Sequence, residues 1–433
     1  MQRRIAVVGT GYVGLTTGAC LASLGHDVVC ADIDPAKVAR LRAGHVDILE
    51  PGLAELVARG IAAGNLSFVV GARAAIADDV DVVFLCVPTP MGPDGAADLR
   101  AVESVVTELG PVLPAGTAVA TKSTVPVGTA DWLTGLVGRE DVAVVSNPEF
   151  LREGSAVDDF LHPNRIVVGS ADQAAAERVG ALYEALGAPV LAVDAPSAEM
   201  VKYAANCFLA MKLSYVNAVA TLCEQVGADV EAVTEGMGFD PRIGRAFLRP
   251  GPGWGGSCLP KDTRALLRTA ELAGADFPLL RAAIDENARQ REHMVAKVEK
   301  ACGGSLAGVR VGLLGLAFKA GTNDLRDSPA LGVAVALAER GAELTAYDPA
   351  IDEQLPGMTV VDDPYQAVKG AVAVVVLTEW PEFVKLDWAA VAELMDGADV
   401  IDTRNLLNAS GVAEAGIRVH GVGRPVSNPL HPR

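Results

Sequence analysis

The residues with the clearest chemical potential lie in one glycine-rich segment, GPGWGGSCLPKD at positions 251–262. Cys258 follows its glycines, and Lys261 and Asp262 come shortly after. A nearby cation favours the thiolate, which is the nucleophilic form of cysteine. A carboxylate at Asp262 can act as a base or orient a water molecule, and the glycines let a ligand approach the backbone closely. The segment therefore predicts a cysteine nucleophile; the alternative is a buried, inert cysteine in a surface loop.

The start of the chain carries a pattern typical of dinucleotide binding. A predicted strand, Arg4–Val8, runs into GTGYVG at 9–14, a helix follows, and a second strand, Asp27–Ala31, ends at Asp32. The glycines allow a tight turn and let a pyrophosphate approach the helix N-terminus. Asp32 would bond the ribose and repel a 2′-phosphate, so the pattern predicts NAD rather than NADP. The nearby cation Lys37 would favour NADP instead, unless it is a solvated charge on a helix.

Polar residues stand where further predicted strands end. These apolar strands cover residues 80–87, 118–122 and 142–145. Thr89, Thr124 and Glu149 follow them. Ligands of open parallel sheets bind at the carboxyl ends of strands. Although threonine and proline also simply end strands, three such ends in one sheet favour a site.

The middle of the chain, from Ser197 to about Cys302, is predicted to be helical. Its longest helix, Ala198–Val226, carries Lys202 and Asn206 four residues apart, so both lie on one helix face. This face either lines a cavity or carries two exposed polar side chains. A helix of this length also suggests an interdomain spine or a dimer seam.

The last third repeats the strand and helix alternation. Strands are predicted at 309–315, 343–347, 371–377 and 399–402, with a helix at 329–340. The insertion at 317–326 replaces the tight turn, so a nucleotide would not be held there by the usual dinucleotide grip. The fold class is therefore α/β, with two Rossmann-like, doubly wound parallel-sheet domains joined by a long central helix in an all-α dimerisation region.

The composition of the chain limits which partners, metal sites and locations are expected. The net charge of −18 disfavours nucleic acid and anionic membranes as partners. The seven cysteines and six histidines lack metal-ligand spacing, so no metal and no disulfide framework are expected, and a reducing cytoplasm fits best. No apolar run is long enough for a membrane span, and the opening residues do not form a signal peptide. Residues 427–433 are expected to form a loose tail.

Six motifs, in order along the chain, resemble nucleotide-sugar dehydrogenases of the UDP-glucose 6-dehydrogenase family. They are GTGYVG at 9–14, STVPVGT at 123–129, NPEFLREG at 147–154, the Lys202/Asn206 helix, FLRPGPGWGGSCLPKD at 247–262 and FKAGTNDLRDSP at 318–329. The resemblance implies an NAD-binding Rossmann domain (1–196), a central helical dimerisation domain that carries the cysteine loop (197–303) and a C-terminal Rossmann-like UDP-binding domain (304–433). It also implies a homodimer or a higher homo-oligomer.

The chemistry implied by the resemblance is a four-electron oxidation of the C6 alcohol of UDP-glucose to UDP-glucuronate, with two NAD⁺ consumed. Cys258 would trap the intermediate aldehyde as a thiohemiacetal, which is oxidised to a thioester and then hydrolysed. Lys202 would stabilise the oxyanion. Water would be held or activated by Asn206, Asp262 and Thr124, with Glu149 assisting thioester hydrolysis.

The implied binding residues form two sets. Together with the dinucleotide motif, the resemblance assigns cofactor binding to Gly9, Gly11, Tyr12, Val13, Gly14, Asp32, Lys37, Thr89, Thr124, Glu153, Lys261 and Arg326. It assigns substrate binding to Glu149, Phe150, Leu151, Arg152, Glu153, Lys202, Asn206, Arg242, Phe247, Leu248, Arg249, Pro250, Gly251, Gly255 and Lys319. Arg242 matches an arginine that a neighbouring subunit inserts into the substrate site.

Several alternatives stay open at this point. The GPG before the cysteine motif disfavours GDP-mannose as the substrate, and Ser257 disfavours UDP-N-acetylated sugars, although Trp254 replaces the family's usual phenylalanine and could shift sugar preference. A two-electron β-hydroxyacid dehydrogenase would lack the cysteine and the second Rossmann-like unit. The YxxxK spacing at Tyr365 lacks the glycine loop of a short-chain reductase. A non-catalytic NAD or UDP-sugar sensor is the remaining class.

Overall fold

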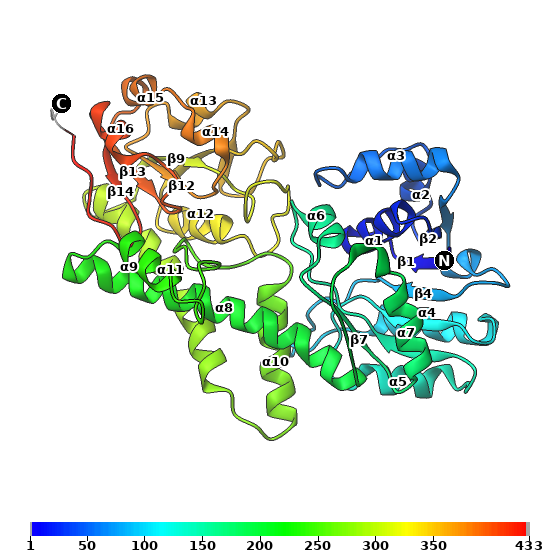
Figure 1. Cartoon of the computed structure of the whole chain (residues 1–433). Helices are drawn as coiled ribbons and strands as arrows, with labels where there is room; N and C mark the ends of the chain where they lie inside the picture. The colour runs from blue at the N-terminus through cyan, green and yellow to red at the C-terminus, as the bar shows by residue number, and fades with distance from the viewer. Residues whose placement is uncertain (1, 430–433) are drawn as a thin grey trace. The chain divides into compact units, whose positions relative to one another are not determined.

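The computed structural model describes residues 2–429 and divides into two compact units (Figure 1). The first unit comprises Met1–Ala205 and Arg264–Ala275, and the second comprises Asn206–Thr263 and Asp276–Arg433. Each unit contains one sheet with its own core. Among the described residues, no helix combines the length and the apolar character needed to cross a membrane.

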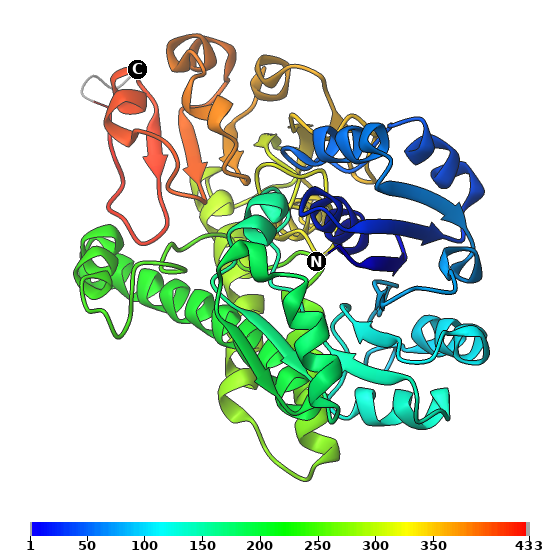
Figure 2. The same cartoon turned by 45° about the vertical axis from the view of Figure 1, so that its right-hand side comes forward.

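The first unit is built on an eight-stranded sheet of order β3-β2-β1-β4-β5-β6-β7-β8 (Figure 2). Every neighbouring pair is parallel except β6 and β7, which are antiparallel and share one residue pair, Ser146 and Gly169. The strands are β1 (Arg4–Val8), β2 (Asp27–Asp32), β3 (Leu66–Val70), β4 (Val82–Leu85), β5 (Ala118–Thr121), β6 (Ala143–Ser146), β7 (Ile166–Gly169) and β8 (Val190–Val193).

Helices cover both faces of this sheet, which explains why its central strands read as continuous apolar runs. The helices are α1 (Tyr12–Ser23), α2 (Pro35–Arg42), α3 (Leu53–Ala63), α4 (Arg100–Leu109), α5 (Thr129–Val137), α6 (Ala156–Leu161) and α7 (Gln173–Ala181). Buried residues of α1, α3 and α7 contribute to one hydrophobic cluster, and those of α4 and α5 contribute to another.

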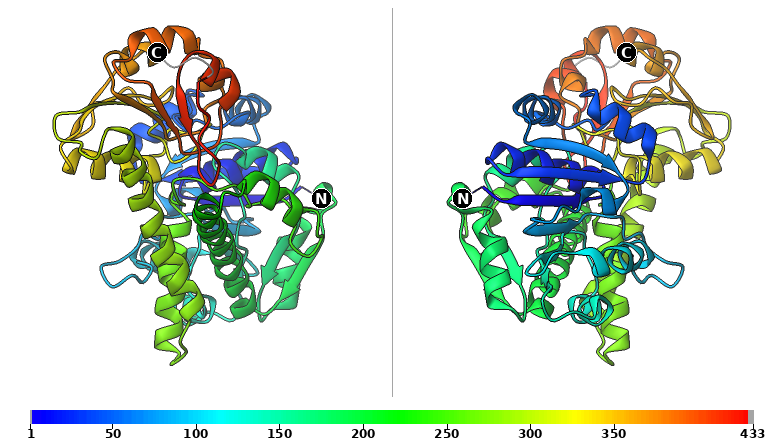
Figure 3. Two further views of the ribbon diagram at one scale, coloured as in Figure 1. Left: turned by 90° about the vertical axis from the view of Figure 1, so that its left-hand side faces the viewer. Right: turned by 90° about the vertical axis from the view of Figure 1, so that its right-hand side faces the viewer.

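The second unit contains a six-stranded, fully parallel sheet of order β11-β10-β9-β12-β13-β14 (Figure 3). The strands are β9 (Arg310–Leu314), β10 (Glu343–Tyr347), β11 (Met358–Val360), β12 (Ala373–Val376), β13 (Asp399–Asp402) and β14 (Arg418–His420). The helices of this sheet are α12 (Pro329–Glu339), α13 (Pro364–Val368), α14 (Pro381–Val384), α15 (Trp388–Leu394) and α16 (Ala409–Glu414).

The middle of the chain is helical, as predicted. It consists of α8 (Ala195–Val226), α9 (Val230–Gly238), α10 (Leu259–Leu272) and α11 (Pro278–Ala301). In the second unit α8 and α11 lie side by side, and the Ser214 hydroxyl of α8 donates to the carbonyl of Ala283 at 2.6 Å. The predicted fold class, with two Rossmann-like parallel sheets and a long central helix, is confirmed.

Local differences from the prediction concern strand ends. The predicted strand at 80–87 shortens to β4, because the chain turns away after Leu85 and the Val87 carbonyl accepts a hydrogen bond from the Ser123 hydroxyl at 2.6 Å. In the expected loose tail, Ser427 forms an isolated antiparallel bridge with Val419, and residues 430–433 lie outside the described part of the chain.

Candidate active site

The turn after β1 has the geometry that a dinucleotide requires. Gly9 has φ +95°, and a side chain there would lie 2.7 Å from the Cys86 carbonyl oxygen. A Cβ on Gly14 would lie 1.9 Å from the carbonyl oxygen of Gly9. Gly11, which precedes α1, has no atom near its missing Cβ and gives α1 no side-chain cap. The N-terminal N–H groups of α1 can therefore donate hydrogen bonds to a pyrophosphate, so these residues fit the predicted cofactor.

Asp32 lies at the end of β2, where a ribose would be recognised. Its Oδ2 accepts hydrogen bonds from the Thr10 amide at 3.1 Å and from the Thr10 hydroxyl at 2.5 Å. Lys37 forms an ion pair with the same oxygen at 3.0 Å. Burial by itself raises the pKa of Asp32, but the bonds from Thr10 and Lys37 outweigh burial and lower the pKa to about 2. Lys37 therefore neutralises Asp32 rather than standing as a solvated charge.

A glutamate that the sequence did not single out links the dinucleotide turn to the segment at 147–154. Glu50 is 6% exposed, and its carboxylate accepts hydrogen bonds from the Tyr12 hydroxyl and, at 2.7 Å, from the Gly154 amide. It also accepts the Val157 amide at 3.3 Å. Tyr12 is therefore turned toward Glu50 and Gly154. No sequence motif connects residues so far apart in the chain.

A buried lysine–glutamate pair forms the charged centre of the first unit. Lys202 on α8 is 3% exposed and Glu149, after β6, is 7% exposed. The Lys202 ammonium donates to Glu149 Oε1 at 2.9 Å and to the Glu149 carbonyl at 2.6 Å. Glu149 Oε2 accepts the Leu151 amide at 2.5 Å. Buried charges of this kind are stable only when they are paired and hydrogen-bonded.

The other strand-end residues of the first unit gather near this centre of the sheet. The Thr89 hydroxyl, which is buried, donates to the Thr124 carbonyl at 2.9 Å and so ties the turns after β4 and β5 together. Arg165 stacks on the Phe150 ring, with its guanidinium carbon 3.4 Å from the ring centroid. The turns after β4, β5 and β6 thus lie together at one edge of the sheet, as their position at strand ends predicts.

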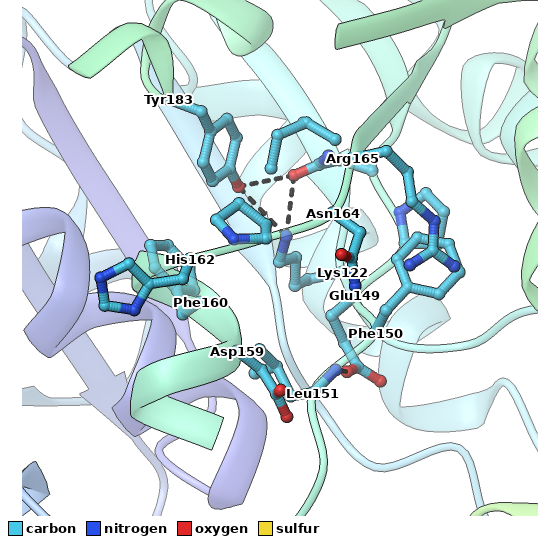
Figure 4. Close-up of a pocket in the computed structure, with 14 residues that line it drawn as sticks. Lys122, Glu149, Phe150, Leu151, Asp159, Phe160, His162, Asn164, Arg165 and Tyr183 are labelled. Carbon is cyan, nitrogen blue, oxygen red and sulfur yellow. Dashed lines mark hydrogen bonds between the residues drawn. The ribbon is translucent and has the colours of Figure 1, made fainter. Parts of the chain in front are cut away.

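The segment at 147–154 borders a small polar cavity of about 60 Å³ (Figure 4). Arg152 does not line this cavity; its exposed guanidinium forms an ion pair with Asp159 at 2.5 Å. Glu153 is half-buried. The side chain of Arg152 is therefore committed to Asp159, whereas the backbone of Phe150 and Leu151 follows Glu149 directly.

The cysteine loop of the second unit leads directly into α10. Cys258 is half-buried and stands one residue before Leu259, and its carbonyl accepts the Asp262 amide at 2.9 Å. The first turn of a helix stabilises negative charge. It therefore favours the thiolate, which is the form of cysteine that attacks carbonyl carbons. The Ser257 hydroxyl lies 3.6 Å from the cysteine sulfur.

Asp262 is fully buried and is held from two sides. Asn206 donates its side-chain amide to Asp262 Oδ2 at 2.6 Å, and the Lys261 ammonium contacts Oδ1 at 2.6 Å. The Cys207 thiol lies 3.7 Å from the Asp262 carbonyl. Asn206, Lys261 and Asp262 thus form one hydrogen-bonded group in the turn that begins at Cys258.

The glycines of the cysteine loop let it pack closely within the second unit. A side chain at Gly255 would lie 2.0 Å from the Asp327 carbonyl oxygen, so the loop contacts the 318–329 segment backbone to backbone. Asn217 accepts the Gly251 amide at 2.9 Å, and Gln290 donates to the Gly251 carbonyl at 2.7 Å. Trp254 is 7% exposed and its indole N–H donates to the Ser214 hydroxyl at 2.9 Å. The loop is therefore rigidly attached to α8 and α11.

The remaining predicted substrate residues of the second unit differ in exposure. Leu248 and Pro250 are buried, Arg249 is exposed, and Phe247 has a left-handed backbone with φ 60°. The Lys319 ammonium lies 5.4 Å from the Phe318 ring centroid. Arg404, which the sequence analysis missed, donates to the Phe318 carbonyl at 3.1 Å. Arg404 lies two residues after the end of β13. Polar residues near strand ends had led to Thr89 and Glu149, so the same criterion could have identified Arg404.

Two predicted arginines are engaged by acidic neighbours at the surface. Arg242 pairs with Asp240 at 2.6 Å, and its side chain is 87% exposed. Arg326 pairs with Asp324 at 2.6 Å. The hydrogen bonds that Arg242 donates to Asp240 raise the pKa of Arg242. Both pairs are Asp-x-Arg turns in which the aspartate also accepts the arginine amide.

The structure thus assembles two chemical groups, one in each unit. In the first unit the dinucleotide turn, Asp32, Thr124 and Glu149 stand at the ends of strands of one sheet, and Lys202 of α8 pairs with Glu149. In the second unit Cys258 is followed by the Asn206–Lys261–Asp262 group. No cluster of histidine, cysteine and acidic side chains suited to a metal ion occurs within residues 2–429.

Models of known families match three consecutive stretches of the chain. They describe the NAD-binding, central and UDP-binding domains of the UDP-glucose/GDP-mannose dehydrogenase family, and they match residues 3–187, 196–289 and 312–409. The chain belongs to this family. It is an NAD-dependent oxidoreductase with a nucleotide-sugar binding domain.

Relatives in this family match over nearly the full length. The "UDP-glucose 6-dehydrogenase TuaD" of Bacillus subtilis (strain 168) is 43% identical over 444 residues, which cover 100% of this chain and 95% of that protein. The structure of a UDP-glucose dehydrogenase from the archaeon Pyrobaculum islandicum has a TM-score of 0.89 at 38% identity and covers 98% of each chain. A UDP-D-ManNAc dehydrogenase from Pyrococcus horikoshii has a TM-score of 0.87 at 30% identity, with 97% of this chain and 99% of that chain covered.

Proposed function

We propose that the chain oxidises the C6 alcohol of UDP-glucose to the carboxylate of UDP-glucuronate, with two NAD⁺ reduced for each sugar. The observation that carries the proposal is the position of Cys258, one residue before α10 and one turn before the fully buried, doubly hydrogen-bonded Asp262. The names of relatives at 43% and 38% identity support UDP-glucose as the substrate.

The protein's own groups suggest a division of labour. Cys258 holds the sugar as a thiohemiacetal and then as a thioester, so the aldehyde is never released. The Lys202 ammonium, already directed at oxygen atoms, stabilises the oxyanion of each addition step. Asp262 and Asn206 orient a water or hydroxyl, Thr124 holds the hydrolytic water, and Glu149 accepts its proton.

Bound NAD⁺ supplies the electron acceptor for both oxidations. Gly9, Gly11, Tyr12, Val13 and Gly14 form its pyrophosphate turn, and Asp32 with Lys37 meets the ribose. Thr89, Glu153, Lys261 and Arg326 complete the proposed cofactor side. Lys261 also neutralises Asp262, since the two side chains form an ion pair at 2.6 Å.

The substrate would be bound by the segment 149–153, by residues 247–251 with Gly255, and by Lys319 at the diphosphate. We also propose the three domains that the resemblance implies, with boundaries after residues 196 and 303. The packing of Trp254 against Ser214 gives no support to a role of Trp254 in sugar choice. We further propose a cytoplasmic location.

We also propose that the chain works as a homodimer or a higher homo-oligomer. Phe208, Tyr215 and Leu222 are 61%, 58% and 56% exposed and repeat every seven residues on one face of α8. A second copy of the same helix is a self-complementary partner for such an apolar stripe. Arg242, with its exposed side chain, would then reach the site of the neighbouring subunit.

Sedimentation tests the assembly. The protein is expected to sediment as a dimer or larger, and the double substitution Phe208→Glu and Tyr215→Glu should yield monomers. A mixture of inactive Arg242→Ala and Cys258→Ala chains should recover part of the activity if the arginine acts in trans. A wild-type monomer at micromolar concentration would contradict the assembly.

A substrate panel tests the reaction. UDP-glucose, GDP-mannose and UDP-N-acetylmannosamine are each incubated with the protein and NAD⁺, and NADH absorbance is compared with the sugar consumed. We expect two NADH for each UDP-glucose and little turnover of the other sugars. One NADH for each sugar would reject the thioester route, and binding without NADH formation would indicate a sensor.

A further inference from the structure

Lys122 is a fully buried lysine that lies directly behind the turn carrying Glu149. It follows β5, is 4% exposed, and donates to Asn147 Oδ1 at 3.0 Å and to the Tyr183 hydroxyl at 3.1 Å (Figure 4). The Tyr183 hydroxyl donates to the same Asn147 oxygen at 2.7 Å. These three side chains therefore form a closed triangle of hydrogen bonds within the first unit.

Aromatic rings surround the Lys122 ammonium. The rings of Phe84, Phe160 and Tyr183 have their centroids 5.9, 6.0 and 5.2 Å from the nitrogen. Burying an ammonium is costly unless hydrogen bonds and ring faces compensate. Leucine or methionine would fill the same space without this cost, so the core alone does not explain a lysine here.

The triangle replaces backbone hydrogen bonds at the weakest joint of the sheet. Strands β6 and β7 run antiparallel and share one residue pair, Ser146 and Gly169. Immediately after that pair, the Asn147 side-chain amide donates to the Val167 carbonyl of β7 at 2.7 Å. Lys122 holds the other end of the Asn147 side chain. The ends of β5, β6 and β7 are thus joined through one asparagine.

Two residues of the proposed mechanism project from the strand ends that this triangle joins. Thr124 stands two residues after Lys122, and Glu149 stands two residues after Asn147. A cavity of about 60 Å³, lined by Lys122, Asn147, Glu149 and Tyr183, lies between the triangle and the glutamate. Movement of Asn147 would therefore move the turn that sets the direction of the Glu149 carboxylate.

Charge couples the same groups. Burial lowers the pKa of Lys122 to about 8, while Cys86 and Glu149 act to raise it and Lys202 acts to lower it. These are the titratable groups that face the ammonium, from the turn after β4, the turn after β6 and α8, together with Tyr183 after α7. Lys122 therefore interacts with Glu149 by charge as well as through Asn147.

We propose that Lys122 is a positioning residue for thioester hydrolysis, acting on Glu149 through Asn147 and by its charge. In that step the water oxygen bonds to the thioester carbon, the carbon–sulfur bond breaks, and its electron pair leaves on the Cys258 sulfur. The water proton passes to the Glu149 carboxylate, which must be ionised and correctly directed. This inference rests on the proposed function.

The test substitutes Lys122→Met and Tyr183→Phe, with Lys385→Met as a matched control at an exposed lysine. Lys122→Met is expected to lower kcat about tenfold to a hundredfold, while KM for UDP-glucose changes less than about threefold. Peptide mass spectrometry should find a thioester on Cys258 during turnover.

Tyr183→Phe keeps the ring and the ammonium but removes both hydrogen bonds of the Tyr183 hydroxyl, so its kcat should fall by a smaller factor. Lys385→Met should match the wild type in every measurement. Thermal unfolding of each variant controls for misfolding; if Lys122→Met does not fold, an unchanged kcat in Tyr183→Phe contradicts the proposal.

The outcomes separate the two levels of inference. Wild-type turnover with an unchanged kcat in Lys122→Met, or with a lowered kcat but no thioester on Cys258, overturns the role of Lys122 and leaves the proposed function standing. Failure of the wild type to form NADH from any nucleotide sugar overturns the proposed function, and the role of Lys122 with it.

Discussion

The two sheets share one strand order, and they differ in the turn that follows their first central strand. Strands β3-β2-β1-β4-β5-β6 and β11-β10-β9-β12-β13-β14 have the same crossover pattern. In the first unit β1 passes through Gly9 and Gly11 into α1, which has no side-chain cap. In the second unit residues 315–328 separate β9 from α12, and the Ser328 hydroxyl caps α12 by accepting the Leu331 amide.

The aspartate at the end of β2, Asp32, and the aspartate that follows β10, Asp348, also have different partners. Asp32 is partly accessible and is neutralised by Lys37, so its carboxylate can also meet a ribose. Asp348 is 3% exposed, and its Oδ2 accepts the amides of Leu316 and Ala317 and the Trp380 indole N–H. The first unit leaves its strand-end donors available to a ligand, whereas the second uses them to fold its own insertion.

The largest effect should come from adding one methyl group to α1. Gly14→Ala places a Cβ 1.9 Å from the Gly9 carbonyl oxygen, so the dinucleotide turn must move. We expect a loss of more than about 3 kcal/mol of stability and loss of NAD⁺ binding by calorimetry. Gly332→Ala in α12 is the matched control, because its Cβ would meet the flexible Arg291 side chain at 3.1 Å. If Gly14→Ala and Gly332→Ala reduced stability and NAD⁺ binding equally, the proposed difference between the two turns would be wrong.

Asp348→Ala should be the next most damaging change. It removes the acceptor of four N–H groups, two of them fully buried backbone amides, and unsatisfied buried donors cost about 1–3 kcal/mol each. Urea unfolding should show a loss of about 3 kcal/mol, with NAD⁺ affinity preserved. A stable Asp348→Ala protein with weakened NAD⁺ binding would reverse the roles assigned to the two aspartates.

Lys122, which follows β5, should make the stability of the protein depend on pH. Its counterpart after β13, Thr403, should not. Lys122 binds its proton less tightly in the folded state, where its pKa is about 8, than in the unfolded chain, where it is near 10.5. The unfolded state therefore binds more protons between these values, and stability relative to Lys122→Met rises with pH. From pH 7 to 9.5 this relative gain should be about 2 kcal/mol.

The counterpart, Thr403, is fully buried, and its hydroxyl donates to the Val376 carbonyl at 2.7 Å. Thr403→Val should change stability by the same amount at both pH values. A Lys122→Met difference that stays constant between pH 7 and 9.5 would mean that the buried ammonium keeps an ordinary affinity for its proton.

Asp32→Ala should have the smallest effect of this set. NAD⁺ affinity should fall about tenfold, which is about 1.4 kcal/mol, and discrimination against NADP⁺ should shrink because Lys37 becomes available to a 2′-phosphate. The free energy of unfolding should fall by about 1 kcal/mol, because the buried Thr10 amide and hydroxyl lose their acceptor. Full retention of the NAD⁺ preference would show that other residues exclude NADP⁺.

Much of the fold could be predicted because its central strands are buried on both faces. The predicted bounds of β1, β10 and β13 agree with the structure to the residue. Five strands in the described part of the chain were not predicted: the edge strands β3, β8, β11 and β14, and the buried strand β7. Val190 and Leu191 of β8 are 44% and 47% exposed, and β14 carries Arg418 and His420. Edge strands bury little and therefore leave a weak apolar signal.

The candidate site was predictable where its members are neighbours in the chain. Cys258, Lys261 and Asp262 fall within five positions, and the structure joins the latter two directly. Glu50 and Lys122 could not be found this way, because their partners come from sheet register and loop packing; Tyr183 is 61 positions from Lys122. The pairing of Arg242 and Arg326 was readable from an aspartate two residues before each.

The covalent role of Cys258 is the central claim, and trapping the intermediate tests it most directly. Glu149→Gln protein is mixed with UDP-glucose and excess NAD⁺, quenched in acid, digested, and analysed by peptide mass spectrometry. We predict a UDP-glucuronyl thioester on the peptide that contains Cys258, and its absence when Cys258→Ala is added to the same chain. A Cys258→Ala protein that still forms two NADH and one UDP-glucuronate from each UDP-glucose would contradict the account.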